Sequence, residues 1–284
     1  MARVIRTVGI VGSGVMGCGL AEVAARAGYD VIVCSRSQAS ADAVRHAVAC
    51  GVSKAVDRGK TTVEERDEIM ARIVAAEDLS ALAECDLVIE SVIEDIDVKL
   101  AMFADLDHAA KRSAILATNT STLPVIDLAL ATSRPEQVCG IHFFNPATVM
   151  KLVEVVRPLT AADETIADAL TFVTSCGKEP VEVQDHAGFI VNALLFPYLN
   201  NAVRMLERGT ASIESIDAAM KGGCNFPMGP FALLDLVGLD TSVAILATIH
   251  ASFGSAADAP AQALLDKVAA GHLGRKSGRG FYPY

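Results

Sequence analysis

The sequence predicts an α/β protein: a doubly wound, mainly parallel sheet with a projecting pair of helices, followed by an all-helical domain. Apolar runs bounded by turn residues alternate with helical patterns through the first two thirds of the 284 residues. This alternation is typical of a parallel sheet flanked by helices. From Gly188 onward only helical patterns remain. We therefore expect one domain over residues 1–187 and a second over residues 188–284.

The expected strands are the short apolar runs of the first domain. They cover Val4–Val11, Val31–Cys34, Arg72–Ala75, Asp86–Glu90, Ala114–Thr118, Val138–Phe143, Met150–Val156 and Pro180–Val183. The charged stretch from Ala39 to Arg72 is too long for one ordinary crossover helix. It predicts two helices that project from the sheet and turn near Gly59. Thr62 is the expected N-cap of the second helix, since Glu65 three residues later completes a capping box.

The expected helices of the second domain cover Phe189–Gly209 and Ser212–Gly222, with further helices after Pro230 and after Pro260. A helical domain with this apolar content often completes itself against a second copy. A homodimer is therefore the expected assembly.

Composition excludes several classes of protein. The net charge of −10 argues against nucleic acids and anionic membrane surfaces as partners. Every apolar segment is too short to span a bilayer, and the first residues lead straight into a strand, which leaves no room for a signal peptide. The seven cysteines lack the spacing of a zinc site or a disulfide framework. They predict reduced core thiols in a cytoplasmic protein without a metal.

A glycine-rich turn lies between the first expected strand and the following helix. It reads Gly12-Ser13-Gly14-Val15-Met16-Gly17. The first glycine permits the tight turn, Gly14 lets the backbone approach a pyrophosphate, and Gly17 lets helix and strand pack closely. The phosphates would lie at the positive end of the helix. This arrangement predicts a Rossmann-type dinucleotide site.

Two residues after the second expected strand bear on which dinucleotide binds. Ser35 stands where an acidic residue normally accepts from the ribose 2′-hydroxyl, and Arg36 follows it. A carboxylate would repel a 2′-phosphate, whereas an arginine fork suits it. The pair favours NADP(H), with NAD(H) as the weaker alternative; Arg36 as a merely solvated loop cation is the structural alternative.

A histidine and a glutamate are the candidate acid–base pair. His142 lies near the end of one apolar strand, and alternation in the next strand places Glu154 on the same face as Met150, Leu152 and Val156. A carboxylate on an apolar face needs a partner, and His142 is the economical one. A hydrogen-bonded core histidine, with Glu154 paired to Lys151 or Arg157, is the alternative.

Ordered motifs from the first strand to Tyr282 resemble the L-3-hydroxyacyl-CoA dehydrogenase family, and within it the bacterial 3-hydroxybutyryl-CoA dehydrogenase group. They are Gly12–Gly17, Asp86–Glu94, Asn119–Thr122, His142–Pro146, Gly188–Asn192, Pro227–Pro230 and Leu273–Tyr282.

The resemblance implies a role for each matching residue. His142 is implied as the acid or base and Glu154 as its partner. Ser121 and Asn192 are implied to orient the substrate near its 3-oxygen. The implied dinucleotide contacts beyond the glycine turn are Glu94, Lys99, Asn119 and Asn145. Lys54, with Arg58 four residues further on, is implied to meet the phosphorylated end of CoA.

The resemblance also implies hydride transfer between a nicotinamide and C3 of acetoacetyl-CoA or (S)-3-hydroxybutyryl-CoA. Three rival hypotheses stand beside this one. The chain could reduce a longer 3-oxoacyl-CoA or an acyl-carrier-protein thioester, act on a free hydroxy acid, or bind a dinucleotide without turnover. Phe226 departs from the family pattern, in which a histidine is usual. The resemblance therefore does not define the acyl pocket at this position.

Overall fold

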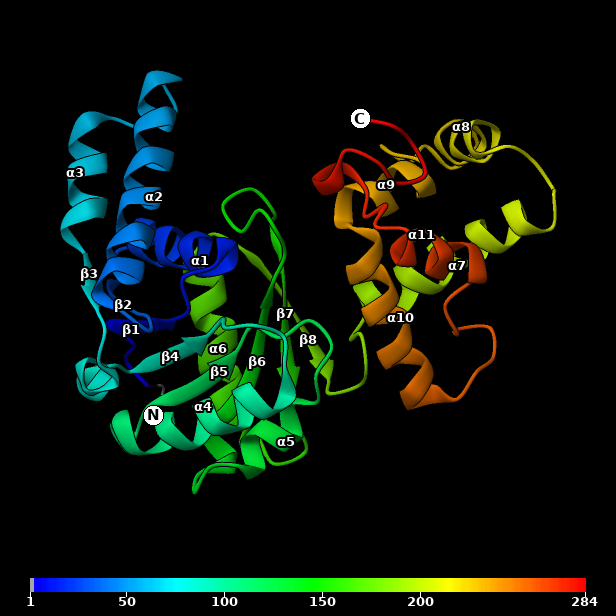
Figure 1. Cartoon of the computed structure of the whole chain (residues 1–284). Helices are drawn as coiled ribbons and strands as arrows, with labels where there is room; N and C mark the ends of the chain where they lie inside the picture. Colours follow the sequence, from blue (N-terminus) through cyan, green and yellow to red (C-terminus); the bar gives the residue numbers. More distant parts are fainter. Residues whose placement is uncertain (1–2) are drawn as a thin grey trace. The chain divides into compact units, whose positions relative to one another are not determined.

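The computed structural model describes residues 3–284 and divides the chain into two compact units between His186 and Ala187. The first unit holds the sheet and the second is helical (Figure 1). The predicted fold class is therefore confirmed.

The sheet of the first unit has eight strands in the order β3-β2-β1-β4-β5-β6-β7-β8. Their bounds are β1 Thr7–Val11, β2 Asp30–Cys34, β3 Ile73–Ala76, β4 Leu87–Glu90, β5 Ile115–Thr118, β6 Val138–Phe143, β7 Leu152–Arg157 and β8 Glu179–Gln184. Neighbouring strands pair in parallel except β6 and β7, which are antiparallel. The carboxyl ends of β1, β4, β5 and β6 therefore meet at one edge of the sheet.

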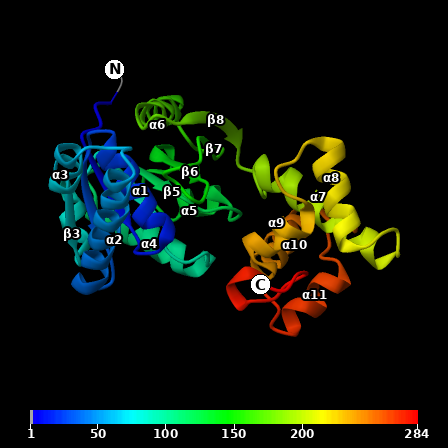
Figure 2. The same cartoon turned by 90° about the horizontal axis from the view of Figure 1, so that it is seen from above.

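Helices cover both faces of this sheet (Figure 2). One face packs against α1 Val15–Arg26, α2 Gln38–Asp57 and α6 Asp163–Ser175, and the other against α4 Ile96–Ala109 and α5 Val125–Leu130. Short 3₁₀ turns at Leu79–Glu84 and Pro135–Gln137 join the remaining elements. The strands read as continuous apolar runs because both of their faces are buried.

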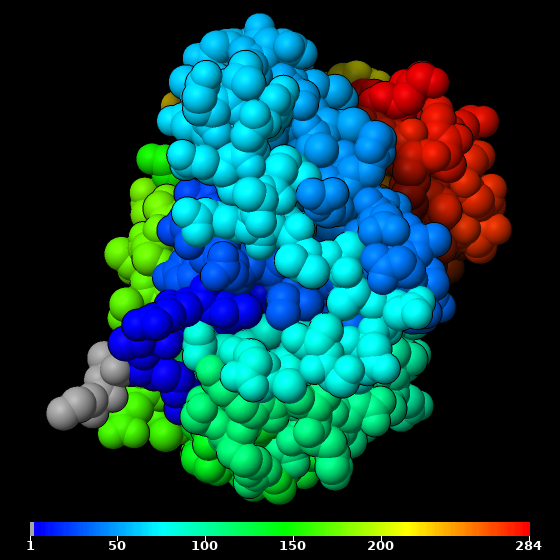
Figure 3. All heavy atoms as spheres, turned by 90° about the vertical axis from the view of Figure 1, so that its left-hand side faces the viewer, coloured from blue at the N-terminus to red at the C-terminus, as the bar shows by residue number. Residues whose placement is uncertain are grey.

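The projecting helix pair is present as predicted. It consists of α2 and α3 Val63–Ala71, which lie against each other at the surface of the first unit (Figure 3). Ser37 caps α2 by accepting from the backbone amide of Ser40. Thr62 and Glu65 form the predicted capping box at the start of α3.

The second unit packs five α-helices around a separate apolar core that includes Leu199, Phe231 and Leu246. The helices are α7 Val191–Glu207, α8 Ile213–Cys224, α9 Pro230–Val237, α10 Leu239–Phe253 and α11 Gln262–Ala269, followed by a 3₁₀ turn at Arg275–Ser277. Within residues 3–284, no single helix is long and apolar enough to cross a membrane; α9 and α10 pass that test only together, and they are bent by 98°.

Three details differ from the sequence prediction. The strand expected from Met150 begins at Leu152, so the exposed Met150 does not share the buried face with Glu154. The segment after Pro230 forms two helices, because the chain turns at Gly238 with φ of 106°. Cys50 and Cys224 are exposed and are not core thiols.

Candidate active site

Polar side chains gather where β4, β5 and β6 end. Glu90 closes β4, Thr118 closes β5, and the loop 119–122 follows β5 directly. Ligands of doubly wound sheets bind at this carboxyl edge. The predicted catalytic residues of the first unit all lie on these elements or on the adjoining hairpin.

His142 connects two of the predicted residues. β6 and β7 pair in antiparallel register with His142 directly opposite Glu154. His142 Nδ1 lies 2.8 Å from Glu154 Oε2, and His142 Nε2 lies 3.1 Å from Ser121 Oγ. His142 is 4% exposed and Glu154 1%. Because an ionised carboxylate only accepts, this geometry fits an imidazole with a proton on Nδ1, while Nε2 faces the Ser121 hydroxyl.

Glu94 holds the loop that carries Ser121. Its Oε1 accepts from the Ser121 amide at 2.8 Å, from the Thr122 amide at 3.3 Å and from Thr120 Oγ1 at 2.5 Å. One carboxylate oxygen therefore fixes three consecutive residues of the loop. The resemblance implied a dinucleotide contact for Glu94 and did not reveal this bracing role.

Asn119 joins the same loop to the histidine strand. Its backbone amide donates to the Glu90 carbonyl at 2.8 Å, and its side-chain Oδ1 accepts from the Phe143 amide at 2.9 Å. Phe143 follows His142 directly. The Asn119 side chain is buried and its oxygen is used in this hydrogen bond. Its implied contact with a dinucleotide stays a prediction.

The turn between β6 and β7 is anchored from two sides. Lys178 Nζ donates to the carbonyls of Ala147 at 2.6 Å and Met150 at 2.9 Å. On the other side, α1 packs so closely that a Cβ at Gly19 would lie 2.9 Å from the Ala147 Cβ. The turn between the strands that carry His142 and Glu154 is thus packed against α1, the helix that follows the glycine turn.

The glycine turn fits a bound pyrophosphate. A Cβ at Gly12 would lie 2.3 Å from the Ser91 carbonyl oxygen, and one at Gly17 would lie 2.2 Å from the Gly12 carbonyl oxygen. At Gly14 a Cβ would meet nothing within 4 Å. Among the described residues, no side chain caps the N-terminus of α1, which leaves its first amides available to a phosphate. Ser13, Val15 and Met16 complete the turn.

Ser35 and Arg36 follow the end of β2. Ser35 is 8% exposed and its amide donates to the Ala76 carbonyl, whereas Arg36 is exposed. The N-terminus of α2, two residues beyond Arg36, already faces a carboxylate: the Gln38 amide donates to Glu77 Oε2 at 3.0 Å. The sequence prediction did not include Glu77.

Other predicted site residues lie in diverse surroundings. Lys99 is 1% exposed and its Nζ lies 2.7 Å from Glu90 Oε1 and 3.4 Å from Glu94 Oε2. Lys54, in the last turn of α2, and Asn145, just after β6, are exposed. Asn192 lies near the start of α7 in the second unit and is 7% exposed. Ser121, His142 and Glu154 are therefore brought together within the first unit, and the roles of the others stay predictions.

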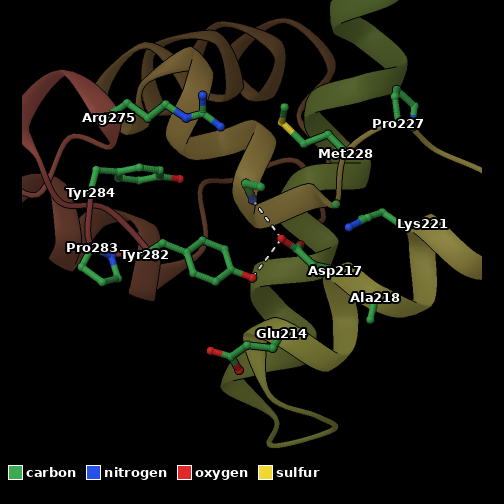
Figure 4. A pocket seen from close by; sticks show the side chains of 12 residues that line it. Glu214, Asp217, Ala218, Lys221, Pro227, Met228, Arg275, Tyr282, Pro283 and Tyr284 are labelled. Carbon is green, nitrogen blue, oxygen red and sulfur yellow. Dashed lines mark hydrogen bonds between the residues drawn. The ribbon is translucent and has the colours of Figure 1, made fainter.

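A cavity of about 500 Å³ lies within the second unit (Figure 4). Asp217 on α8 faces it and accepts from Tyr282 Oη at 3.0 Å and from the Ala232 amide at 3.1 Å. Burial, together with this carboxylate, raises the pKa of Tyr282, which keeps the phenol protonated as a donor. The carboxylate is thus held as an acceptor at the start of α9. Across residues 3–284, no three His, Cys, Asp or Glu side chains group as a metal site.

Known proteins resemble this chain over both of its units. The model of the 3-hydroxyacyl-CoA dehydrogenase NAD binding domain matches residues 7–186, and that of the C-terminal domain matches residues 188–284. A 3-hydroxybutyryl-CoA dehydrogenase of Mycobacterium tuberculosis is 45% identical over 100% of both chains. The solved (S)-3-hydroxybutyryl-CoA dehydrogenase of Ralstonia eutropha is 40% identical, with a TM-score of 0.97 over 99% of each chain. A 3-hydroxyadipyl-CoA dehydrogenase of Escherichia coli is 40% identical over 99% of this chain and 59% of its own length.

Proposed function

Because the chain belongs to the 3-hydroxyacyl-CoA dehydrogenase family, we propose that it interconverts acetoacetyl-CoA and (S)-3-hydroxybutyryl-CoA with NADP(H) as the preferred dinucleotide. His142 is the proposed acid and base, and Glu154 its partner. Ser121 and Asn192 are proposed to orient the 3-oxygen of the substrate.

The observation that carries the proposal is the line of hydrogen bonds from Glu154 through His142 to Ser121. Glu154 Oε2 holds Nδ1 of the imidazole, and Nε2 faces the Ser121 hydroxyl at the carboxyl edge of the sheet. A ring oriented in this way presents one nitrogen to a reacting oxygen. The same contacts would hold a merely structural histidine, and the glycine turn beside them favours the catalytic role.

In the reducing direction, a protonated His142 donates its Nε2 proton to the 3-oxygen as the C3 ketone becomes an alcohol. The bound nicotinamide supplies the hydride that C3 receives. Glu154 stabilises the imidazolium before the transfer, and the Ser121 hydroxyl holds the oxygen in line. In the oxidising direction, Nε2 takes the proton back from the 3-hydroxyl.

The preference for NADP(H) rests on Ser35 and Arg36. Arg36 is exposed, and the residues before and after it in the sequence are serines, which carry no charge. A charge-assisted bond to a 2′-phosphate is the interaction it would supply. Lys54 is proposed to contact the phosphorylated end of CoA, and Glu94, Lys99, Asn119 and Asn145 the dinucleotide.

A homodimer in the cytoplasm completes the proposal. Its support is the exposure of large apolar side chains on the second unit, including Leu194 at 71%, Phe253 at 54% and Phe226 at 42%. Light scattering coupled to size exclusion tests the assembly: a single species of twice the chain mass supports it, and a monomer at micromolar concentration contradicts it.

Initial rates with acetoacetyl-CoA test the reaction and the dinucleotide together. We expect wild-type rates with NADPH at least about tenfold above those with NADH, since a charged hydrogen bond contributes roughly 1.5–3 kcal/mol. Arg36→Ala should erode that preference, with Arg66→Ala on α3 as the matched control. His142→Gln should lower kcat by roughly 10²-fold to 10⁴-fold.

Each result bears on a different part of the proposal. Equal rates with both dinucleotides, unchanged by Arg36→Ala, would remove the NADP(H) preference and leave the enzyme class. Full activity in His142→Gln would remove the assigned acid. The substrate assignment would change if the enzyme turned over 3-oxoadipyl-CoA, longer 3-oxoacyl-CoAs or carrier-protein thioesters faster than acetoacetyl-CoA. If the protein bound a dinucleotide and turned over none of these substrates, it would be a binding protein.

A further inference from the structure

We propose that Glu90 is a positioning residue for Ser121, acting through Lys99 and Thr118 from the end of β4. The inference rests on the proposed function, because Ser121 is the group it serves. Neither the glycine turn nor the acid–base pair accounts for Glu90, which is a fully buried carboxylate at 0% exposure.

Every contact of the Glu90 carboxylate ties down a neighbour at the carboxyl edge. Its Oε1 accepts from Lys99 Nζ at 2.7 Å and from the Val92 amide at 2.6 Å. Its Oε2 accepts from Thr118 Oγ1 at 2.8 Å. The carboxylate thus joins helix α4, the loop after β4 and the end of β5.

Two routes lead from Glu90 to the Ser121 loop. In the first, Lys99 Nζ lies between Glu90 and Glu94, 3.4 Å from Glu94 Oε2, while Glu94 Oε1 holds the Ser121 amide. In the second, Thr118 Oγ1 donates its proton to Glu90 and accepts from the Thr120 amide at 3.1 Å. The first route thus ends on the Ser121 amide and the second on the amide of the preceding residue, Thr120.

The charge of Glu90 decides how these routes behave. Lys99 is 1% exposed, and a buried ammonium needs a close anion. With Glu90 present, Lys99 has one buried anion and leaves most of the acceptor capacity of Glu94 to the loop. Without that charge, the one carboxylate that still pairs with Lys99 among residues 3–284 is that of Glu94, whose side chain is 40% exposed. Glu94 is then drawn toward Lys99 and its hold on the Ser121 amide weakens.

The buried ion pair itself favours a positioning role over a stabilising one. Burying two charges costs solvation that their attraction only about repays. A pair that contributes little net stability still sets the place of its neighbours. Ser121 Oγ must stay 3.1 Å from His142 Nε2, and a displacement of about 1 Å costs roughly 10²-fold in rate.

Glu90→Gln tests the proposal because it keeps the shape and removes the charge. Glu84→Gln, on an exposed side chain of the 3₁₀ turn before β4, is the matched control. We expect Glu90→Gln to lower kcat for acetoacetyl-CoA reduction by roughly 10-fold to 100-fold. In the Ser121→Ala background the same change should lower kcat by less than about threefold, since residues that act as a unit are not additive.

Amide hydrogen exchange tests the positioning without any turnover. In Glu90→Gln, a peptide that contains Ser121 and Thr122 should exchange at least about fivefold faster, because local opening is easier. A peptide from α11 in the second unit should be unchanged. If Glu90→Gln loosens the whole chain, Thr118→Val takes its place, because it removes the acceptor of the Thr120 amide at nearly constant volume and should speed the same peptide.

The outcomes separate the two proposals. Unchanged exchange at Ser121 in a folded variant, or the same fall in kcat with and without the Ser121 hydroxyl, would overturn the role of Glu90 and leave the enzyme assignment intact. A wild-type protein without turnover would overturn the enzyme assignment, and the exchange measurement would still decide whether Glu90 positions Ser121.

Discussion

Glu154 lies directly opposite His142 across the antiparallel pair β6 and β7, with Oε2 2.8 Å from Nδ1. The two side chains meet because β7 returns along β6 after a short turn, so that the register of the strands sets the contact. Both are almost fully buried. The carboxylate therefore acts on the imidazole with little screening by water.

Replacing this carboxylate by an amide should impair the reaction more than the fold. We expect Glu154→Gln to lower kcat by roughly 10²-fold, because the imidazolium loses its counter-charge while the Gln oxygen can still accept from Nδ1. Glu179→Gln on β8, whose side chain is 72% exposed, is the matched control. Steady-state rates with acetoacetyl-CoA measure the effect. Wild-type kcat in a folded Glu154→Gln protein would contradict the assigned pairing.

Glu77 should oppose binding of a 2′-phosphate. Its carboxylate accepts from the Gln38 amide at the N-terminus of α2, a position where the helix dipole stabilises an anion by roughly 0.3–1 kcal/mol. A 2′-phosphate beside Arg36 would therefore meet a negative charge already held there. Removing that charge by Glu77→Gln should tighten NADPH about twofold to fivefold at low salt and leave NADH within experimental error. Titration of the dinucleotide fluorescence measures both affinities.

A matched variant separates this local effect from a change in net charge. Glu164→Gln removes the same charge from the first turn of α6, which packs against the strands β6 to β8. It should leave the affinity for NADPH unchanged. Equal tightening by both variants, or equal tightening of NADPH and NADH by Glu77→Gln, would contradict a role for Glu77 at the 2′-position.

Local patterns predicted the parts of the site that depend on neighbours in sequence. Alternation predicted that Glu154 lies on an apolar face, although not together with Met150. The need of such a carboxylate for a partner then pointed to His142, and Thr62 with Glu65 predicted the start of α3. The network around Glu90 was not predicted, because it depends on α4 packing over the sheet so that Lys99 meets the end of β4. A glutamate that ends an otherwise apolar strand was the available signal.

The thiols divide by burial in a way that composition does not reveal. Burial raises the pKa of Cys85, Cys139 and Cys176 to about 12, so that almost none is thiolate at pH 8. Cys50 and Cys224 are exposed. We expect these two to react first with a disulfide reagent at pH 8, and all seven cysteines to react in denaturant.

Serine variants identify the thiols that react. The double variant Cys50→Ser/Cys224→Ser should lose the rapid phase and keep the slow one. Rapid labelling of this variant in its folded state would contradict the division, because the five remaining thiols are buried or half-buried. The pH dependence has a defined sign: raising the pH toward 12 speeds the buried thiols, because thiolate forms only there.

Of the arginines in the first unit, Arg134 should contribute most to its stability. Its side chain is 1% exposed and donates to the carbonyls of Leu106, Asp107, Ala110 and Lys111, while Nε lies 2.9 Å from Asp107 Oδ1. Leu106 and Asp107 lie in the last turn of α4, and Ala110 and Lys111 follow it. A helix leaves its last carbonyls short of partners, although the Leu106 and Lys111 carbonyls also accept from the amides of Ala110 and Ala114. One buried guanidinium therefore replaces the water that these carbonyls would otherwise bind.

Removing that guanidinium should destabilise the fold strongly. Arg134→Met leaves the buried Asp107 carboxylate without its buried cation and removes the guanidinium donors from four carbonyls, of which those of Leu106 and Lys111 keep a backbone donor; breaking such a buried pair costs about 3–5 kcal/mol. Arg112→Met is the matched control, because Arg112 also pairs with Asp107, at 3.5 Å, from a side chain that is 70% exposed. An exposed pair contributes about 0–1 kcal/mol. Thermal unfolding of both variants measures the contrast: we expect Tm to fall by at least about 6 °C in Arg134→Met and by much less in Arg112→Met. Equal falls in the two variants would show that the charge on Asp107, and not the capping of α4, sets the contribution of Arg134.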